Sequence, residues 1–269
     1  MEKKSLVKGT VFGFCLLVGY FLLMIIANSL TDNKNIQDLL TLAVQILVFI
    51  AAYFKMKKSY GIDLGFGTKG LKDGMFRYGG LMFIVIIANL FTEYMHPEIT
   101  FSAAFVRICV IFLSKMGVGL AEDMIFRGVF FNVFKDRLGE SRKGLFISMI
   151  VSSSIFGAIH LLNLTGNPQL IMATLAQVIY AVFIGCFFCV VYYRSKNIWS
   201  CVILHGLVDF TGSFWKCFAD PAKKLVEADN TIWMSVFEVG ICLILFVSAM
   251  IQLRKATSER SIETEPAYS

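Results

Sequence analysis

Apolar segments long enough to cross a lipid bilayer follow one another along almost the whole chain. They are separated by short charged or glycine-containing stretches and lie at about 10–30, 36–54, 75–92, 101–118, 119–135, 144–163, 170–193, 197–215 and 231–253. Hydrophobic residues make up 57% of the 269 residues and charged residues only 16%, whereas about 25% of an ordinary soluble domain is charged. Because this composition offers too little polar surface for a water-soluble fold, we expect an all-α, polytopic transmembrane helical bundle.

Two of these segments, 101–118 and 119–135, adjoin at Gly117 and Gly119. A single helix over both would be about 50 Å long, which is more than one crossing requires. We therefore expect one of the two segments to cross the membrane and the other to lie at its surface or half-buried. This arrangement leaves about eight crossings.

Most of the 25 lysines and arginines lie in loops that these crossings place on one side of the membrane, among them the stretches at 55–58, 135–143 and 254–260. Because an excess of basic residues marks the cytoplasmic side, we expect both termini in the cytoplasm and the chain in a bacterial plasma membrane. Charge spread over short loops also argues against a nucleic-acid partner, which would require a clustered basic face. One integral-membrane domain should cover 1–253, followed by a polar, disordered tail at 254–269.

Ionisable side chains interrupt the apolar segments at three places, and each such side chain costs about 2.5–3.5 kcal/mol at bilayer depth. The first place is Ala121-Glu122-Asp123-Met124-Ile125-Phe126-Arg127-Gly128. Asp123 and Arg127 are four residues apart, so on a helix they can form an ion pair, whereas Glu122 points about 100° away. An ion pair that only fixes helix packing would explain Asp123 and Arg127 but not Glu122.

The other two places supply histidines. His160 ends the stretch Phe156-Gly157-Ala158-Ile159-His160, and a lone histidine near a helix end is more often an interfacial residue than a catalyst. His205 and Asp209 are four residues apart inside an apolar segment, so Asp209 could orient the imidazole or share its proton. The structural alternative for this pair is a polar contact that joins neighbouring helices.

Glu122, His160 and His205 offer one carboxylate and two imidazoles from three helices, a set that suits two kinds of peptide hydrolysis. Glu122 could act as a general base on water while the histidines stabilise the oxyanion. Alternatively, the three side chains could bind Zn²⁺ and leave one position open for water. The zinc alternative lacks the H-E-x-x-H motif, so we expect that no cofactor is required.

Three patterns, E-[ED]-x-x-x-R-G, F-x-x-x-H and H-x-x-x-[DN], follow one another on successive apolar segments between about 119 and 215. In this order they resemble the CPBP family of CAAX prenyl proteases and bacteriocin-processing or immunity proteins, also called Abi. The resemblance implies an intramembrane endopeptidase that cleaves a membrane-bound peptide or protein in the lipid bilayer.

The resemblance also implies a role for each matching residue. Glu122 would activate water with help from His160, and His205 and Asp209 would stabilise the oxyanion. The site would be supported by Asp123, Arg127 and Phe156.

Two positions depart from the family pattern. The usual Glu-Glu is Glu122-Asp123 in this chain, and the shorter Asp123 could support the site less well or merely hold Arg127. Asp209 stands where the prenyl-protease branch has Asn, and an ionised Asp cannot donate a hydrogen bond to an oxyanion. Asp209 must therefore be protonated, orient His205 or bind a metal.

The catalytic groups must meet at one depth in the membrane, and this requirement decides between the two adjoining segments. His160 follows its charged loop by about 24 Å of helix, far from the positive side. Glu122 can reach it only if 119–135 is the crossing, so 101–118 should be the interfacial or re-entrant helix, a place that also suits Arg107 and Lys115. The site should then lie toward the external half of the membrane.

Two other functions are compatible with the sequence. A non-catalytic immunity or scaffold protein of the same family would tolerate the departure at Asp123. A proton-coupled transporter could also use buried Glu, His and Asp, but the chain has no inverted repeat that would support one.

Overall fold

The computed structural model describes residues 6–92, 96–219 and 229–264, and over these residues the chain forms helices and no strand. Six helical segments are long and apolar enough to cross a membrane, and Met82–Phe91 and Ile198–Thr211 are shorter apolar helices. The expected polytopic helical bundle is confirmed.

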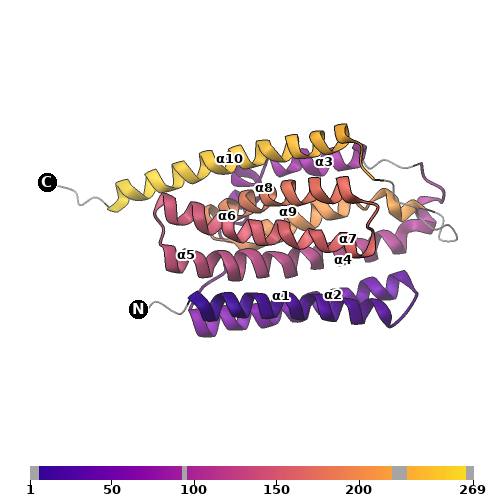
Figure 1. Cartoon of the computed structure of the whole chain (residues 1–269), viewed down its shortest axis with the longest axis horizontal. Helices are drawn as coiled ribbons and strands as arrows, with labels where there is room; N and C mark the ends of the chain where they lie inside the picture. Colours follow the sequence, from indigo (N-terminus) through magenta and orange to yellow (C-terminus); the bar gives the residue numbers. More distant parts are fainter. Residues whose placement is uncertain (1–5, 93–95, 220–228, 265–269) are drawn as a thin grey trace.

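The helical elements follow one another with short connections. Their bounds are α1 (Leu6–Ser29), α2 (Lys34–Lys55), η1 (Met56–Tyr60), η2 (Asp73–Tyr78), α3 (Met82–Thr92), α4 (Phe101–Asp123), η3 (Met124–Phe131), α5 (Asn132–Leu138), α6 (Arg142–Ile159), η4 (His160–Leu162), α7 (Asn163–Gly166), α8 (Ile171–Ser195), α9 (Ile198–Thr211), η5 (Trp215–Phe218) and α10 (Ile232–Thr264). In Figure 1, α1 and α2 lie side by side along one edge of the bundle and α10 runs along the opposite edge. The start of α1 and the end of α10 therefore lie at the same end of the molecule.

Side-chain caps account for the start of several helices. Asn33 accepts hydrogen bonds from the backbone N–H groups of the first turn of α2. Thr100 and Ser141 do the same for α4 and α6. Such residues satisfy N–H groups that have no partner inside the helix, which is why each helix begins where it does.

The expectation that 101–118 forms a separate interfacial or re-entrant helix is wrong. Residues Phe101–Leu138 form one continuous helical segment, and α4 packs against both α2 and α9. The glycines at the junction allow this close packing, because a Cβ on Gly117 would lie 2.0 Å from Gln45 Oε1 and one on Gly119 would lie 2.6 Å from the Val202 carbonyl oxygen. Arg107, which suggested an interfacial position, forms an ion pair with Asp38 of α2.

The polar tail also differs from its expected disorder. α10 continues through Arg254 as far as Thr264, and residues 265–269 lie outside the described residues. Two ion pairs hold this extension to the bundle: Arg194 Nη2 lies 3.0 Å from Glu259 Oε2, and Arg260 pairs with Glu140. The partners come from distant parts of the sequence, which explains why local composition did not indicate a helix.

A π-helical segment, η3, joins α4 to α5 directly after the Glu122-Asp123 pair. Asn132 stabilises it, since Asn132 Nδ2 lies 3.1 Å from the carbonyl oxygen of Arg127 and 3.0 Å from that of Gly128. π-Helical turns often occur at functional sites. Here the segment is buried along its whole length.

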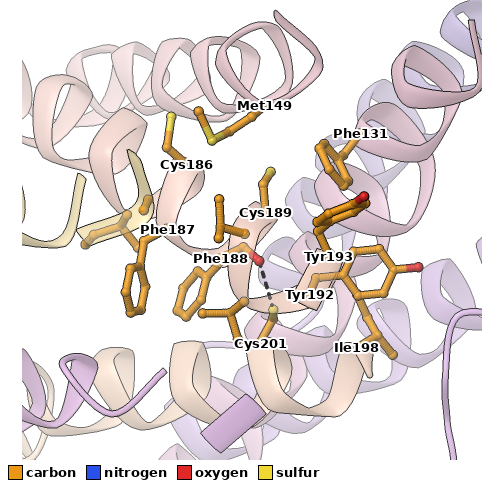
Figure 2. Close-up of a cluster of buried hydrophobic side chains, with 14 of the residues drawn as sticks. Phe131, Met149, Cys186, Phe187, Phe188, Cys189, Tyr192, Tyr193, Ile198 and Cys201 are labelled. Carbon is orange, nitrogen blue, oxygen red and sulfur yellow. Dashed lines mark hydrogen bonds between the residues drawn. The ribbon is translucent and has the colours of Figure 1, made fainter. Parts of the chain in front are cut away.

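The largest apolar cluster lies around α8. Figure 2 shows Cys186, Cys189 and Phe188 of α8 pointing into this cluster together with Cys201 of α9, whose Sγ donates to the Phe188 carbonyl oxygen at 3.3 Å. All seven cysteines are free thiols. Cys186 and Cys189, which are spaced as C-x-x-C, therefore contribute to core packing.

The loop between η1 and η2 packs against the turn between α8 and α9. Asn197 Nδ2 donates to the carbonyl oxygens of Gly67 at 2.6 Å and Lys69 at 2.9 Å. Gly65 has a φ of +70°, and a Cβ there would lie 1.8 Å from the Lys196 carbonyl oxygen. Only glycine fits this close approach of two backbones.

Candidate active site

The end of α4 brings two adjacent acids against α9. Glu122 Oε2 lies 3.7 Å from His205 Nε2, and Asp123 Oδ2 lies 3.1 Å from His205 Nδ1. The two acids therefore contact opposite nitrogens of one imidazole. Gly119 and Gly206 make this possible, because a Cβ on Gly119 would lie 3.0 Å from the Gly206 backbone nitrogen.

Asp123 and Arg127 form the ion pair that their spacing suggested. Arg127 Nη1 lies 3.0 Å from Asp123 Oδ1, and both side chains are 0% exposed. The guanidinium group also lies between two aromatic rings, with Cζ 4.7 Å from the Phe156 ring centroid and 5.2 Å from that of Phe188. A cation between two ring faces is stabilised electrostatically in this low-dielectric setting.

In the structure, Asp123 orients the His205 ring, and Asp209 does not. Asp209 Oδ1 lies 4.0 Å from His205 Nε2, too far for a hydrogen bond. Asp123 instead accepts the Nδ1–H of His205, which turns Nε2 toward Glu122 and Asp209. Sequence spacing indicated the contact within α9, whereas the shorter contact joins two helices.

His160 is fixed by its own helix. Its Nδ1 lies 3.0 Å from the Phe156 carbonyl oxygen and so carries the proton, which leaves Nε2 as an acceptor. The Phe156 ring lies edge-on to both imidazoles, with centroids 5.1 Å from His160 and 5.8 Å from His205. Phe156 therefore positions the two histidines relative to each other.

A cavity of about 780 Å³ connects these residues. Its walls include Glu122, His160, His205 and Asp209, together with apolar side chains of α3, α8 and α10. It extends toward the end of the bundle at which α6 ends and α8 and α10 begin. This end lies opposite the start of α1 and the end of α10 (Figure 1).

The four residues expected to be catalytic thus line one cavity although they come from three different helical segments. A family model described as type II CAAX prenyl endopeptidase Rce1-like matches residues 103–211. Residues 103–211 are similar to that family, and we call them the Rce1-like core. All three sequence motifs lie inside the Rce1-like core, so the family indicated by the motifs is confirmed, although the match covers less than half of the chain. At family level it implies an integral-membrane protease of CAAX type. None of the curated proteins compared with the chain matches it.

The zinc alternative fits this geometry poorly. Within the described residues, no three His, Cys, Asp or Glu side chains are grouped closely enough to hold a metal ion. The Nδ1 bonds of His205 to Asp123 and of His160 to backbone leave both Nε2 atoms free, so it is the spacing of the side chains that disfavours a metal here.

Sequence reasoning gave no role in the site to two polar residues that line the rest of the cavity. Asn89 of α3 lies outside the Rce1-like core, yet its Nδ2 donates to the Val208 carbonyl oxygen at 3.0 Å beside Asp209. Lys115 lies on the same face of α4 as Glu122, two turns earlier. Both are polar residues inside apolar segments, a signal that could have drawn attention to them.

Proposed function

We propose that the chain is an intramembrane endopeptidase in which Glu122 activates a water molecule against a peptide carbonyl group. The observation that carries the proposal is the position of Glu122 Oε2, 3.7 Å from His205 Nε2 on the wall of a cavity that His160 and Asp209 also line. A base and a hydrogen-bond donor side by side at a cavity wall are what hydrolysis of an amide needs.

In the first step, the ionised Glu122 takes a proton from water, and the oxygen of that water bonds to the carbonyl carbon. Negative charge then develops on the carbonyl oxygen. The imidazolium form of His205 donates from Nε2 to this oxygen while Asp123 holds Nδ1–H. In the second step, Glu122 returns the proton to the departing nitrogen as the C–N bond breaks, so protons balance.

His160 and Asp209 complete the arrangement from two sides. The His160 Nε2 acceptor can hold the second hydrogen of the attacking water, because its Nδ1–H is donated to the backbone. Asp209, 28% exposed and 4.0 Å from His205 Nε2, keeps a carboxylate next to the nitrogen that donates to the oxyanion. Asp123, Arg127 and Phe156 position these groups.

The substrate is a membrane-bound peptide or protein. The cavity has apolar as well as polar walls and lies within the membrane-crossing part of the bundle. Because most basic loops lie at the other end, both termini would face the cytoplasm of a bacterial cell and the cavity would open toward the outside.

Replacing Glu122 by Gln tests the proposal, because the amide keeps the shape of the side chain and removes the base. The full chain and Glu122→Gln would be expressed in the same host, and new peptide termini in the membrane fraction would be identified by mass spectrometry. We expect cleavage by the variant to fall by a factor of about 10²–10⁴, the usual contribution of a general base.

Glu259→Gln is the matched control, since it makes the same chemical change at the far end of the bundle. It should leave cleavage unchanged. If Glu122→Gln produced the same new termini as the unmodified chain, Glu122 would not be the base. If neither protein produced new termini but both protected the host equally against a bacteriocin, the non-catalytic immunity function would replace the protease.

A further inference from the structure

A second cavity lies at the opposite end of the bundle from the candidate active site. It measures about 520 Å³ and lies between the start of α6 and the last turns of α10. It is lined by Glu140, Ser141, Arg142, Arg254, Thr257, Ser258 and Arg260. The Arg260 guanidinium group is paired with the Glu140 carboxylate, so the excess of positive charge comes from Arg142 and Arg254.

The position of this cavity along the helices corresponds to the border of the bilayer. Arg254 directly follows Leu253, the last residue of the apolar stretch of α10, and Arg142 lies just before the apolar stretch of α6. Many of the other basic residues lie at the same end, as in proteins whose positive loops face anionic lipid head groups. The arginines are therefore at head-group level.

An exposed apolar stripe runs from the arginines toward the middle of the membrane. On α10, Ile251 and Val247 lie three and seven residues before Arg254, on the same helix face, and are 53% and 49% exposed. On α6, Phe146 lies four residues after Arg142 and is also exposed. Positive charge at the border and apolar surface beneath it match the two parts of a phospholipid.

We propose that this cavity binds the phosphate group of an anionic phospholipid whose acyl chains lie along Phe146, Val247 and Ile251. Arginine binds phosphate through two parallel N–H···O bonds. Ser141 caps α6, so the positive end of the helix dipole adds to the field at this point. The apolar stripe favours a lipid over free phosphate, because free phosphate would leave it unused.

Lipid binding to the purified full chain in detergent would be measured by native mass spectrometry. Phosphatidylglycerol and phosphatidylcholine with identical acyl chains would be compared, and inorganic phosphate would be added as a competitor in a third arm. We expect phosphatidylglycerol to bind about tenfold more tightly than phosphatidylcholine. The double variant Arg142→Gln/Arg254→Gln should lose this preference, and Ile251→Gln should weaken binding of both lipids.

Lys69→Gln/Lys72→Gln is the control, because it removes two exposed positive charges at the same end but outside the cavity. It should keep the preference. Glu140→Gln should increase the affinity for phosphatidylglycerol severalfold, since it removes the one carboxylate of the cavity, and a misfolded variant could not show such a gain. Unchanged binding by the arginine variant would overturn the proposal, and so would displacement of the lipid by an equal concentration of inorganic phosphate. Neither outcome depends on protease activity.

Discussion

The contacts of Asp123 and Arg127, a buried ion pair, predict how much each substitution lowers the unfolding free energy and which of the two lowers it more. The two charges lie 3.0 Å apart, and both side chains are fully buried. Asp123 has a second partner in His205, whose Nδ1 lies 3.1 Å away. Arg127 has no second carboxylate partner among the described residues. The two single substitutions should therefore have unequal effects.

Asp123→Asn leaves the Arg127 charge buried between two aromatic rings, and we expect it to cost about 3–5 kcal/mol of unfolding free energy, as one-sided loss of a buried ion pair usually does. Arg127→Met keeps an apolar side chain between the rings and leaves Asp123 bound to His205, a charge-assisted bond worth about 1.5–3 kcal/mol. We expect this substitution to cost about 2 kcal/mol. The double variant should cost less than the sum of the two single effects, because both substitutions remove the same ion pair.

The free energies can be measured by titrating the full chain in detergent micelles with a denaturing detergent and following the fluorescence of its three tryptophans. Glu122→Gln is the control: it neutralises the neighbouring acid, which lies near His205 at the longer distance of 3.7 Å. It should cost less than about 1 kcal/mol. The reasoning would be refuted if Asp123→Asn cost less than Arg127→Met, or if the double variant lost the sum of the two single effects.

Two further predictions concern the ends of α8. Gly65→Ala should prevent folding, because its Cβ would lie 1.8 Å from the Lys196 carbonyl oxygen, whereas Gly61→Ala, also at positive φ but in open space, should cost only about 1–2 kcal/mol; equal yields of folded protein would contradict this. At the other end, Asp229 accepts the backbone N–H groups of Met172 and Ala173 at 3.0 and 2.8 Å, and the bond to Ala173 contributes most to lowering the pKa of its carboxyl group. Because the folded pKa is the lower one, this stabilisation is present above the ordinary value of 3.8 and is lost as the pH falls through the folded pKa. Asp229→Asn should therefore lower the unfolding midpoint at neutral pH but not in strong acid, and a difference that persisted in acid would show that the charge is not responsible.

The helical bundle and the place of the candidate site could be predicted from the sequence because ionisable residues stand out in apolar segments. Burial of Glu122, His205 and Asp209 at membrane depth is expensive, so the fold must bring them to partners or to a cavity. Spacing within one helix was equally informative. The pair of Asp123 and Arg127 follows from a separation of four residues, and the structure contains it.

Contacts between helices could not be predicted in the same way. Gly117 and Gly119 look like a helix break in the sequence, yet they serve as contact points for α2 and α9. Whether a glycine breaks a helix or allows close helix packing depends on the residue opposite it. For Gly117 that residue is Gln45, which is 72 positions away in the sequence. The partner of Arg107, Asp38, is similarly remote. Both contacts had to be known before 101–118 could be placed correctly.

The same limitation explains why Asp123 appeared to be a weakness of the site. Compared with the usual Glu, Asp is shorter by one methylene, and in the sequence this suggested poorer support. In the structure, one carboxylate oxygen lies 3.0 Å from Arg127 and the other 3.1 Å from His205, in a position with no exposure to solvent. A longer side chain would have to displace the guanidinium group from between Phe156 and Phe188 or push the imidazole toward Glu122. The short side chain of Asp123 therefore fits the close approach of α4 and α9 that Gly119 and Gly206 allow. The departure from the family pattern at this position is explained by how these two helices pack in this chain.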